Sequence, residues 1–404
     1  MDTIKLHWYL PTHGDGRTLT QAGAAPQALY QGADADSAGS DRLARAGANG
    51  APAPAGARAA TIAYMQEVAR AAESSGFEAV LTPTGTWCEE AWIVCSSLIP
   101  VTQKLKFLVA FRPGIIAPAL AAQQAATFQR LSGGRLMLNV VTGAENSEQR
   151  RFGDDLDKNE RYVRTDEFLT IFRGAWNAPF DFKGKYLWAD AAFAPGVEAP
   201  PSIYFGGSSD AALAVAAKHA EVYLSWGEPP AQIGAHFERA GNLAAEQGRA
   251  LRYGARMHVI ARPTAEEAWR AADALLADAD PEAIKAVQEG LQKSNATSQR
   301  RMAELHGGSL DNLEIYPNVW AGVGLLRAGA GTALVGSYEE VAERMAEYVE
   351  VGGVDEFILS GYPHVEEAYW FAEGVTPLLR DRGLLPPATP ATSVPAPDEV
   401  PVAG

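Results

Sequence analysis

Several features that would assign this chain to common protein classes are scarce or missing. Only two cysteines, Cys88 and Cys95, occur in 404 residues, and no Cys/His pair has the spacing of a structural zinc site, so we expect no metal. Basic residues number 34 against 49 acidic ones, a net charge of −15 without the basic clustering of a nucleic-acid binder. No apolar run reaches the roughly 18 residues of a membrane span. The N-terminus also lacks the basic region, apolar stretch and cleavage site of a signal peptide. We therefore expect a reduced, cytoplasmic protein that binds neither nucleic acid nor membrane.

What remains is a chain that can build a large core, because 47% of its residues are hydrophobic. Two segments do not fit that core. In residues 21–60, 25 of 40 residues are Ala, Gly or Pro, which predicts a flexible insertion, with a functional lid as the alternative. Residues 386–404 carry six prolines and two charges, which predicts a disordered tail. Residues 1–385 are expected to form a single domain.

Strand-like and helix-like segments alternate through this domain. Eight such units favour a closed (β/α)8 barrel of the TIM type with insertions, while a doubly wound open sheet is the alternative. No GxGxxG fingerprint follows the first strand, which argues against the open sheet. Between the seventh and eighth strands, residues 264–334 are expected to form helices and then a mobile glycine-rich loop over the barrel mouth. The strands are expected at residues 4–10, 78–83, 105–111, 135–141, 202–207, 221–226, 253–260 and 355–361, and the helices at residues 61–75, 89–99, 118–131, 160–175, 210–220, 229–247 and 338–351.

Polar residues stand where these strands end, which is the face of a barrel that carries the chemistry. Arg256 and His258 are two apart on the seventh strand and so share one of its faces. An unpaired cation inside a barrel is costly, so Arg256 either pairs with a carboxylate or binds an anionic ligand, which we favour. The other strand-end residues are His13, Cys88, Arg112, Asn139, Thr142, Gly207, Ser208, Ser209, Trp226, Tyr362 and His364.

Each of these residues also has an ordinary structural interpretation. The Gly206–Ser209 turn is either an N-capped turn or a phosphate site, because a helix N-terminus offers N–H groups and positive potential to an anion. Cys88 more often would be a packing residue, although its place just before a helix would favour a reactive thiolate. His258 fits a satisfied core histidine, and Tyr362 with His364 fits a rigid turn.

A series of strings, in matching order from about Lys5 to Leu379, resembles the alkanesulfonate monooxygenases, which are reduced-flavin-dependent two-component enzymes of the bacterial luciferase-like barrel superfamily. These strings are PTHGDGRTL, PTGTWCEEAW, LKFLVAFRPG, LSGGRLMLNVVTG, YFGGSSD, YLSWGEPP, RMHVIAR, RMAELHGG, DNLEIYPNVWAGVGLLRAGAGTALVG and LSGYPHVEEAYWFAE. Only the insertion at 21–60 interrupts the match.

The resemblance implies a barrel that binds FMN as FMNH2, supplied by a separate NAD(P)H-dependent FMN reductase. With O2, the enzyme would convert an alkanesulfonate to an aldehyde and sulfite, and it would assemble as a dimer or tetramer. The cofactor carries the redox chemistry, while the protein binds the anion and excludes water. A sulfonate is ionised at physiological pH, so an arginine with its forked donors suits it.

The resemblance also implies roles for individual residues. Arg256 would be the anion clamp and Arg327 the loop arginine that closes on the site. The implied catalytic residues are Cys88, Arg256, His258, Arg327, Tyr362 and His364, and the implied substrate-binding residues are His13, Trp226, Arg256 and Arg327. The implied flavin-binding residues are Asn139, Thr142, Tyr162, Gly207, Ser208 and Ser209.

The chain departs from the family pattern before Cys88, where Thr86 and Trp87 stand in place of a typical Arg-Ser pair. This change favours, as an alternative, a related FMNH2-dependent monooxygenase that acts on a non-sulfonate substrate. Hydride transfer with reduced deazaflavin and a non-catalytic flavin-binding barrel are further alternatives. Against both, Cys88, Arg256, His258, Arg327, Tyr362 and His364 are all present.

Overall fold

The computed structural model describes residues 3–21, 56–143, 145–176, 178–194, 199–307, 309 and 311–387. Most of the predicted insertion at 21–60, and the predicted tail beyond residue 387, lie outside these residues. The two predictions about those segments therefore stay predictions.

Eight parallel strands form a closed barrel, as the sequence predicted. Each strand pairs with the next in chain order, and the last, β13, pairs with the first, β1, so the ring has no open edge. The eight barrel strands are β1 (Lys5–Tyr9), β2 (Ala79–Thr82), β3 (Lys106–Phe111), β4 (Leu136–Val140), β7 (Ile203–Gly206), β8 (Val222–Trp226), β9 (Arg252–Arg262) and β13 (Glu356–Ser360). The closed ring excludes the doubly wound open sheet.

Helices cover the outside of the barrel, and the expected helical segments are confirmed. Several begin at side-chain caps that satisfy free N–H groups; the Asp157 carboxylate, for example, accepts from Glu160 N at the start of α7. The helices are α3 (Ile62–Ser74), α4 (Ala91–Leu98), η1 (Ile99–Val101), α5 (Pro118–Ser132), α6 (Asn146–Arg151), α7 (Lys158–Gly174), α8 (Asp210–His219), α9 (Pro230–Ala245), α10 (Ala265–Leu275), α11 (Pro281–Gln292), α12 (Thr297–Glu304), η2 (Gly322–Leu325), α13 (Tyr338–Glu350), α14 (His364–Trp370), η3 (Phe371–Val375) and α15 (Thr376–Asp381).

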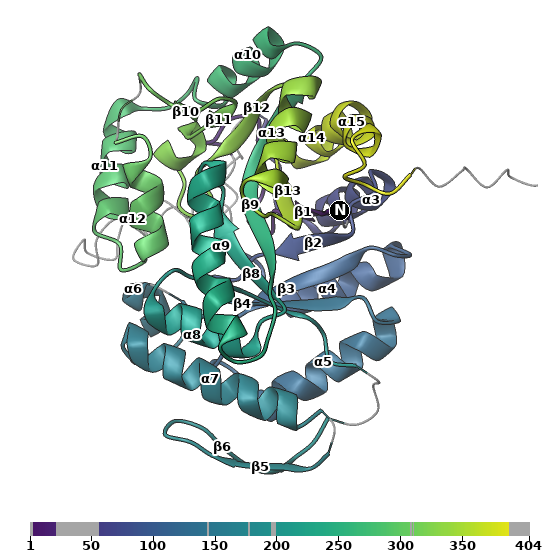
Figure 1. Ribbon diagram of the computed structural model, residues 1–404, viewed down its shortest axis with the longest axis vertical. Coiled ribbons are helices and arrows are strands. Elements are labelled where there is room, and N and C mark those ends of the chain that lie inside the picture. Colours follow the sequence, from purple (N-terminus) through teal and green to yellow (C-terminus); the bar gives the residue numbers. More distant parts are fainter. Residues whose placement is uncertain are drawn as a thin grey trace, which may run out of the picture.

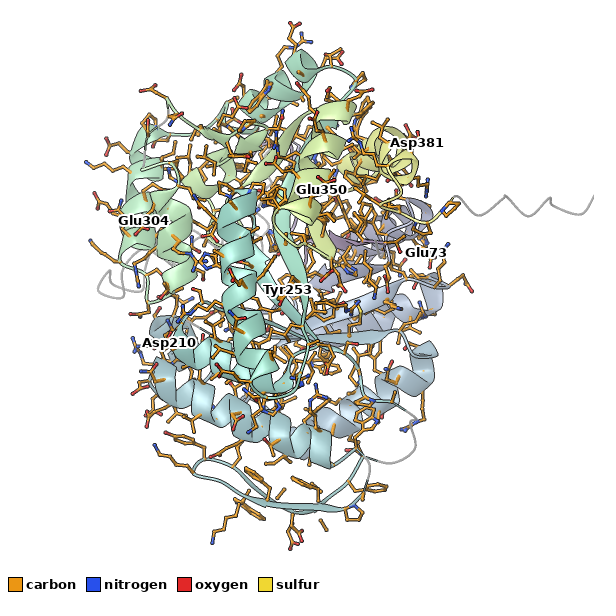
Figure 2. The ribbon with its side chains drawn as sticks, viewed as in Figure 1. Glu73, Asp210, Tyr253, Glu304, Glu350 and Asp381 are labelled. Carbon is orange, nitrogen blue, oxygen red and sulfur yellow. The ribbon has the colours of Figure 1, made fainter. Side chains whose placement is uncertain are left out.

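The two faces of the barrel wall pack against different cores. On β9, Ala255, Met257 and Val259 belong to the large core between barrel and helices, so Arg256 and His258 face the barrel interior. Near the N-terminal end of β9, the ring of Tyr253, labelled in Figure 2, stacks on Phe237 of α9 with centroids 4.8 Å apart. The strand alternation therefore places the predicted cation inside the barrel.

The long stretch between β9 and β13 differs in part from its prediction. It contains the expected helices α10 to α12; Figure 1 shows α10 at the top of the view and α11 and α12 along its left side. The segment predicted as a glycine-rich loop also contains η2 and the strand β12 (Ala333–Ser337). Because β9 extends beyond its pairing with β8, its residues 258–262 pair with β12. The short strands β10 (Glu314–Tyr316) and β11 (Val319–Trp320) continue this sheet.

A hairpin that the sequence did not predict lies at the opposite end of the molecule, beside α7 (Figure 1). It consists of β5 (Phe180–Lys183) and β6 (Trp188–Ala192). The carboxylate of Glu167 on α7 holds the hairpin turn by accepting hydrogen bonds from the main-chain N–H groups of residues 185, 186 and 187 at 2.6–2.9 Å. Such a tertiary contact leaves no periodic signal in the sequence.

Candidate active site

A cavity of about 310 Å³ opens at the C-terminal ends of the barrel strands, within the size range of small-molecule sites. All six residues predicted to bind the flavin line it, as do Trp226 and Arg256. These flavin-site residues are Asn139, Thr142, Tyr162, Gly207, Ser208 and Ser209. The structure therefore brings together the whole predicted flavin set, from β4, α7 and the turn after β7.

The turn between β7 and α8 forms one wall of this cavity. Ser209 caps α8, its side chain accepting from Ala212 N at 3.3 Å, and Asp210, labelled in Figure 2, is the first residue of that helix. At Gly207, which has φ +126°, a Cβ atom would lie 2.9 Å from the Cβ of Ala212 and 3.2 Å from the hydroxyl of Tyr162. The hydroxyl of Ser208 is buried and has no hydrogen-bond partner among the described residues. A glycine cradle, a helix N-terminus and an unsatisfied hydroxyl together suit a phosphate group.

Arg256 lies on β9 opposite Trp226 of β8 and lines the same cavity. Its Nη1 donates to the main-chain carbonyl of Met257 at 2.7 Å, and its guanidinium lies 4.8 Å over the ring of Tyr9. Within the described part of the chain, it forms no salt bridge with a carboxylate. Burial lowers the pKa of Arg256 to about 10, which leaves the side chain charged at neutral pH. Arg256 is therefore a cation whose charge no carboxylate of the described residues neutralises.

Arg112 at the end of β3 is a contrasting case. Its Nη2 lies 2.5 Å from Oε2 of Glu148, and the other carboxylate oxygen of Glu148 accepts from Thr86 N at 3.3 Å. Arg112 and Glu148 both line the cavity. A guanidinium paired in this way offers little charge to a ligand, so Arg256 is the better anion site.

Arg327 lies in the segment after η2 and reaches across to two other predicted residues. It donates through Nη1 to the hydroxyl of Tyr362 and lies 5.3 Å over that ring, while its Nη2 lies 2.7 Å from Nε2 of His13. Arg327 is 9% exposed, and Gly329 of the same segment lines the cavity. The movement of this segment stays a prediction.

His258 has hydrogen-bond partners on both ring nitrogens. Its Nε2 lies 3.1 Å from the carbonyl oxygen of Ala330, which requires a proton on Nε2, and Nδ1 then accepts from the hydroxyl of Ser360 at 2.7 Å. The imidazole also stacks on Tyr362, with centroids 5.4 Å apart. Burial, followed by the nearby Arg256, holds the pKa of His258 well below its usual value. The structure thus favours the satisfied-histidine interpretation, in which His258 ties the Arg327 segment to the barrel.

For Cys88 the structure favours the packing interpretation over the reactive thiolate. Its thiol donates to the carbonyl oxygens of Gly85 at 3.6 Å and Pro83 at 3.7 Å. Burial raises the pKa of Cys88 to about 12, so the sulfur is protonated at neutral pH. Burial thus disfavours a thiolate at this position, and α4 begins only at Ala91, so Cys88 is not at the helix N-terminus itself. A catalytic role for Cys88 stays a prediction.

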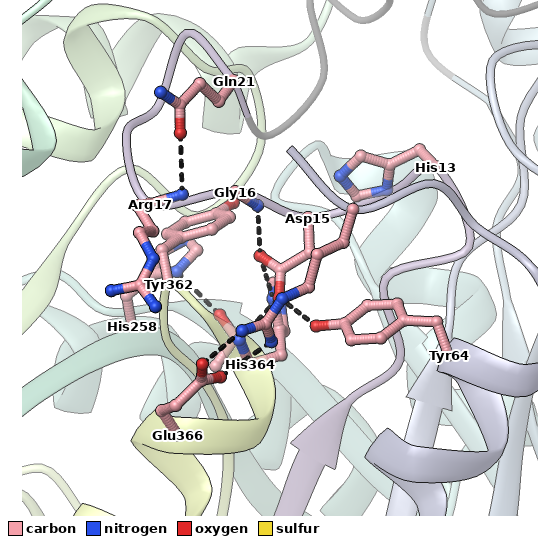
Figure 3. Close-up of polar contacts among 12 residues, drawn as sticks. His13, Asp15, Gly16, Arg17, Gln21, Tyr64, His258, Tyr362, His364 and Glu366 are labelled. Atoms are coloured by element: carbon pink, nitrogen blue, oxygen red, sulfur yellow. Dashed lines mark hydrogen bonds and ion pairs between the residues drawn. The ribbon is translucent and has the colours of Figure 1, made fainter. Parts of the chain in front are cut away.

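His364 begins α14 and is fully buried, close to the rings of Tyr362 and Tyr9. Nδ1 of His364 lies 3.0 Å from a carboxylate oxygen of Asp15. Figure 3 shows Asp15, His13, Tyr362, His258 and His364 gathered around one point. The sequence reasoning quoted PTHGDGRTL without selecting its aspartate, and only the return of β13 beside β1 brings Asp15 to His364.

The predicted residues thus form two adjoining groups, except Cys88, which belongs to neither. The flavin set, Trp226 and Arg256 line the cavity, whereas the second group packs around Tyr362 and is absent from the cavity lining. This second group consists of His13, His258, Arg327, Tyr362 and His364. The sequence reasoning missed three further residues: Tyr9 under Arg256, Lys158 at the cavity wall, and Gln299, whose side chain accepts from Gly329 N at 2.8 Å.

Comparison with known proteins decides the family of this barrel. Residues 4–355 match the family model described as luciferase-like monooxygenase. The chain belongs to the luciferase-like monooxygenase family. Solved structures with the same fold include the riboflavin lyase RcaE, with modified FMN and riboflavin, at 20% identity, TM-score 0.73, and coverage of 95% of this chain and 93% of that one.

Two further members of the same structural group are oxygenases. The long-chain alkane monooxygenase LadA is 20% identical, with TM-score 0.71 and coverage of 96% of this chain and 93% of LadA. The EDTA monooxygenase EmoA from Chelativorans sp. BNC1 is 18% identical, with TM-score 0.70 and coverage of 95% of each chain. At these identities the likeness establishes the barrel fold of this luciferase-like monooxygenase.

Two classes of feature are absent from the described residues. No helix there has the length and apolar character needed to cross a bilayer. No cluster of three or more His, Cys, Asp or Glu side chains in that part of the chain could hold a metal ion.

Proposed function

We propose that this chain is an FMNH2-dependent monooxygenase that desulfonates alkanesulfonates to an aldehyde and sulfite. The observation that carries the proposal is the un-neutralised charge of Arg256 at the cavity wall, since its guanidinium meets main-chain carbonyls and the Tyr9 ring but no carboxylate of the described residues. A partly buried cation left in this state is costly, and an anionic substrate would offset the cost. A sulfonate fits because it stays ionised at every physiological pH.

The cavity residues suit FMN. The turn after β7 would hold the phosphate through the Ser208 hydroxyl and the N-terminus of α8, while Asn139 and Thr142 at the end of β4 would lie against the ring system. When bound and reduced, this cofactor supplies the electrons that activate O2. We expect a separate NAD(P)H-dependent FMN reductase to deliver it, and the enzyme to be a dimer or tetramer in the cytoplasm.

The residues around Tyr362 would complete the site. Arg327 would bring a second guanidinium to the substrate oxygens after releasing Tyr362 and His13. With its segment closed, the site would exclude bulk water, which protects reactive oxygen chemistry from side reactions. His258 would keep that segment in place through Ala330, and His364 and Tyr362 would exchange protons with the reacting groups.

The test is a sulfite assay. The purified chain is supplied with FMN, a flavin reductase, NAD(P)H and O2, together with a panel of alkanesulfonates of increasing chain length. Sulfite release that depends on both the chain and the sulfonate supports the proposal. Flavin turnover without sulfite from any member of the panel would refute the sulfonate assignment.

A second candidate is oxygenation of a non-sulfonate substrate, and Trp87 is the observation that favours it. Its indole packs edge-on against His13, with ring centroids 5.1 Å apart, where the resemblance would place a serine beside an arginine. The Trp87→Ser variant separates the two candidates within the same assay. If Trp87 only shapes a sulfonate site, the variant changes which chain lengths are preferred. If neither form releases sulfite, oxygenation of a non-sulfonate substrate becomes the favoured activity.

A further inference from the structure

Asp15 is buried among polar groups between the start of the barrel and α14. The residue is 1% exposed and lies in the turn that follows β1. One carboxylate oxygen, Oδ1, accepts from Gly16 N at 2.8 Å. The other, Oδ2, accepts from His364 N at 2.7 Å and from the hydroxyl of Tyr64 (Figure 3). A buried carboxylate with several donors is held as an anion.

The surroundings fix Asp15 from more than one element. Main-chain hydrogen bonds join it to Arg58 in both directions, at 2.8 Å and 2.7 Å. The Arg58 side chain then pairs with Glu366 on α14 at 2.8 Å and lies 5.5 Å over the Tyr64 ring. Asp15 therefore has little freedom to move relative to His364.

Asp15 contacts both the main chain and the imidazole of His364. Oδ1 of Asp15 lies 3.0 Å from Nδ1 of the imidazole. This is an ion-pair distance, but the carboxylate oxygen does not lie along the direction of an Nδ1–H bond. Both ring nitrogens are buried and have no hydrogen bond of normal geometry among the described residues, so Nδ1 meets Asp15 at ion-pair distance and Nε2 meets no partner. Titratable groups face the ring from several elements: Tyr9 of β1, His13 and Asp15 of the turn after it, His258 of β9, and Tyr362.

We propose that Asp15 is a positioning residue that keeps a proton on Nδ1 of His364 and so directs Nε2 toward the reacting group. A carboxylate beside one imidazole nitrogen fixes the tautomer and orientation of the ring in this way in hydrolase triads. The catalytic consequence rests on the proposed monooxygenase function. The assignment of the His364 tautomer does not depend on that function.

A purely structural role for Asp15 is the competing explanation. Pro363, the N-cap of α14, provides no side-chain hydrogen bond, and Asp15 supplies an acceptor to the first N–H group of that helix. If this were its whole role, replacing Asp15 would change stability but leave the imidazole tautomer unchanged. The tautomer is therefore the readout that separates the two roles.

The central variant is Asp15→Asn. Oδ2 faces two donors, so the amide oxygen is expected to occupy that side and to turn its NH2 group toward Nδ1 of His364. Nδ1 would then have to accept, which moves the proton to Nε2. We expect kcat to fall roughly 10²-fold or more, the scale of general acid–base contributions, with flavin affinity and KM little changed.

The direct measurement is 15N NMR of the imidazole nitrogens in full-length protein above pH 7. The chain has seven histidines, and a His364→Gln variant assigns the signal of interest. The expected result is an Nδ1–H pattern in the wild type and an Nε2–H pattern in Asp15→Asn. An unchanged His364 pattern in a folded Asp15→Asn protein overturns the proposal.

A matched control comes from the pair formed by Asp166 and His219, which lie 2.8 Å apart on α7 and α8. Asp166→Asn should change the His219 signal and leave His364 and turnover unaffected. If Asp15→Asn fails to fold, Tyr64→Phe removes one donor to the carboxylate, and it should change the His364 signals and the acid limb of the pH–rate profile. If Tyr64→Phe leaves both the His364 signals and the pH–rate profile unchanged, the proposal is overturned. Absence of sulfite from the wild type would refute the proposed function, while the NMR result would still decide the role of Asp15.

Discussion

Nη2 of Arg327 lies 2.7 Å from Nε2 of His13, a contact in which the imidazole has to be the acceptor. A guanidinium has donors and no lone pair to offer, so the contact requires a neutral His13 with its proton on Nδ1. Burial, followed by the charge of Arg327, holds the pKa of His13 well below its usual value. The segment after η2 is thus held to the turn after β1 by a bond that protonation would break.

Removing the Arg327 guanidinium should impair turnover far more than cofactor binding. Among the described residues Arg327 contacts Tyr362 and His13, and it does not line the cavity in which the turn after β7 would hold the phosphate. We expect Arg327→Ala to lower kcat about 10²-fold, the scale of a misplaced reacting group, with flavin affinity little changed. Rapid-reaction kinetics and fluorescence titration with FMN measure the two quantities. Equal losses in both would contradict a role in closure.

Replacing Arg256 with lysine should show whether geometry or charge binds the substrate. Lysine keeps a positive charge but lacks the planar fork that matches two sulfonate oxygens. Loss of one charge-assisted hydrogen bond costs about 1.5–3 kcal/mol, so we expect kcat/KM for sulfonates to fall roughly 10- to 100-fold. Arg112→Lys is the matched control, because Arg112 is already paired with Glu148 and should matter less for KM. Near-normal rates in Arg256→Lys would rule out the clamp.

Acidification should destabilise the fold between about pH 6.5 and 5.5. His258 is 6% exposed and its pKa is held well below 6.5, chiefly by burial, so the unfolded chain takes up a proton in this window that the folded chain refuses. The free energy of unfolding should then fall with decreasing pH by up to about 1.4 kcal/mol per pH unit for each such histidine.

Urea unfolding at pH 7.5, 6.5 and 5.5 measures this slope, and His258→Gln should flatten it. The buried carboxylate of Asp15 should not contribute to this slope. Burial raises its pKa, but the facing His364 and the hydrogen bonds to the carboxylate outweigh burial and lower the pKa to about 2. The stability that Asp15 contributes is present above its ordinary pKa and is lost only at lower pH, outside the measured window. Equal slopes for the wild type and His258→Gln would contradict the assignment.

A methyl group at position 207 should block the proposed phosphate cradle. In Gly207→Ala the new Cβ would lie 2.9 Å from Ala212 and 3.2 Å from the Tyr162 hydroxyl, at φ +126°. We expect a large loss of flavin affinity, measured by fluorescence titration, beyond the cost of backbone strain. Gly76→Ala is the control, since Gly76 has φ +83° with no neighbour within 4 Å of a Cβ and lies before β2. Equal flavin affinity in the two variants would argue against the cradle.

The sequence alone determined the alternating strands and helices and favoured a barrel over an open sheet, because its information is local and periodic. Apolar strand runs and intervening helices specify eight βα units, and spacing by two on β9 puts Arg256 and His258 on one face. Resemblance then supplied the flavin set, which the structure finds around one cavity.

Tertiary structure decided what each polar group meets, since those partners come from distant parts of the chain. Spacing predicted an inward Arg256 but not whether a carboxylate neutralised it, and it could not pair Arg112 with Glu148. Local position favoured a Cys88 thiolate, whereas burial by the fold raises the pKa of that thiol. Asp15 and His364 are 349 residues apart, and only closure of the barrel by β1 and β13 brings them together.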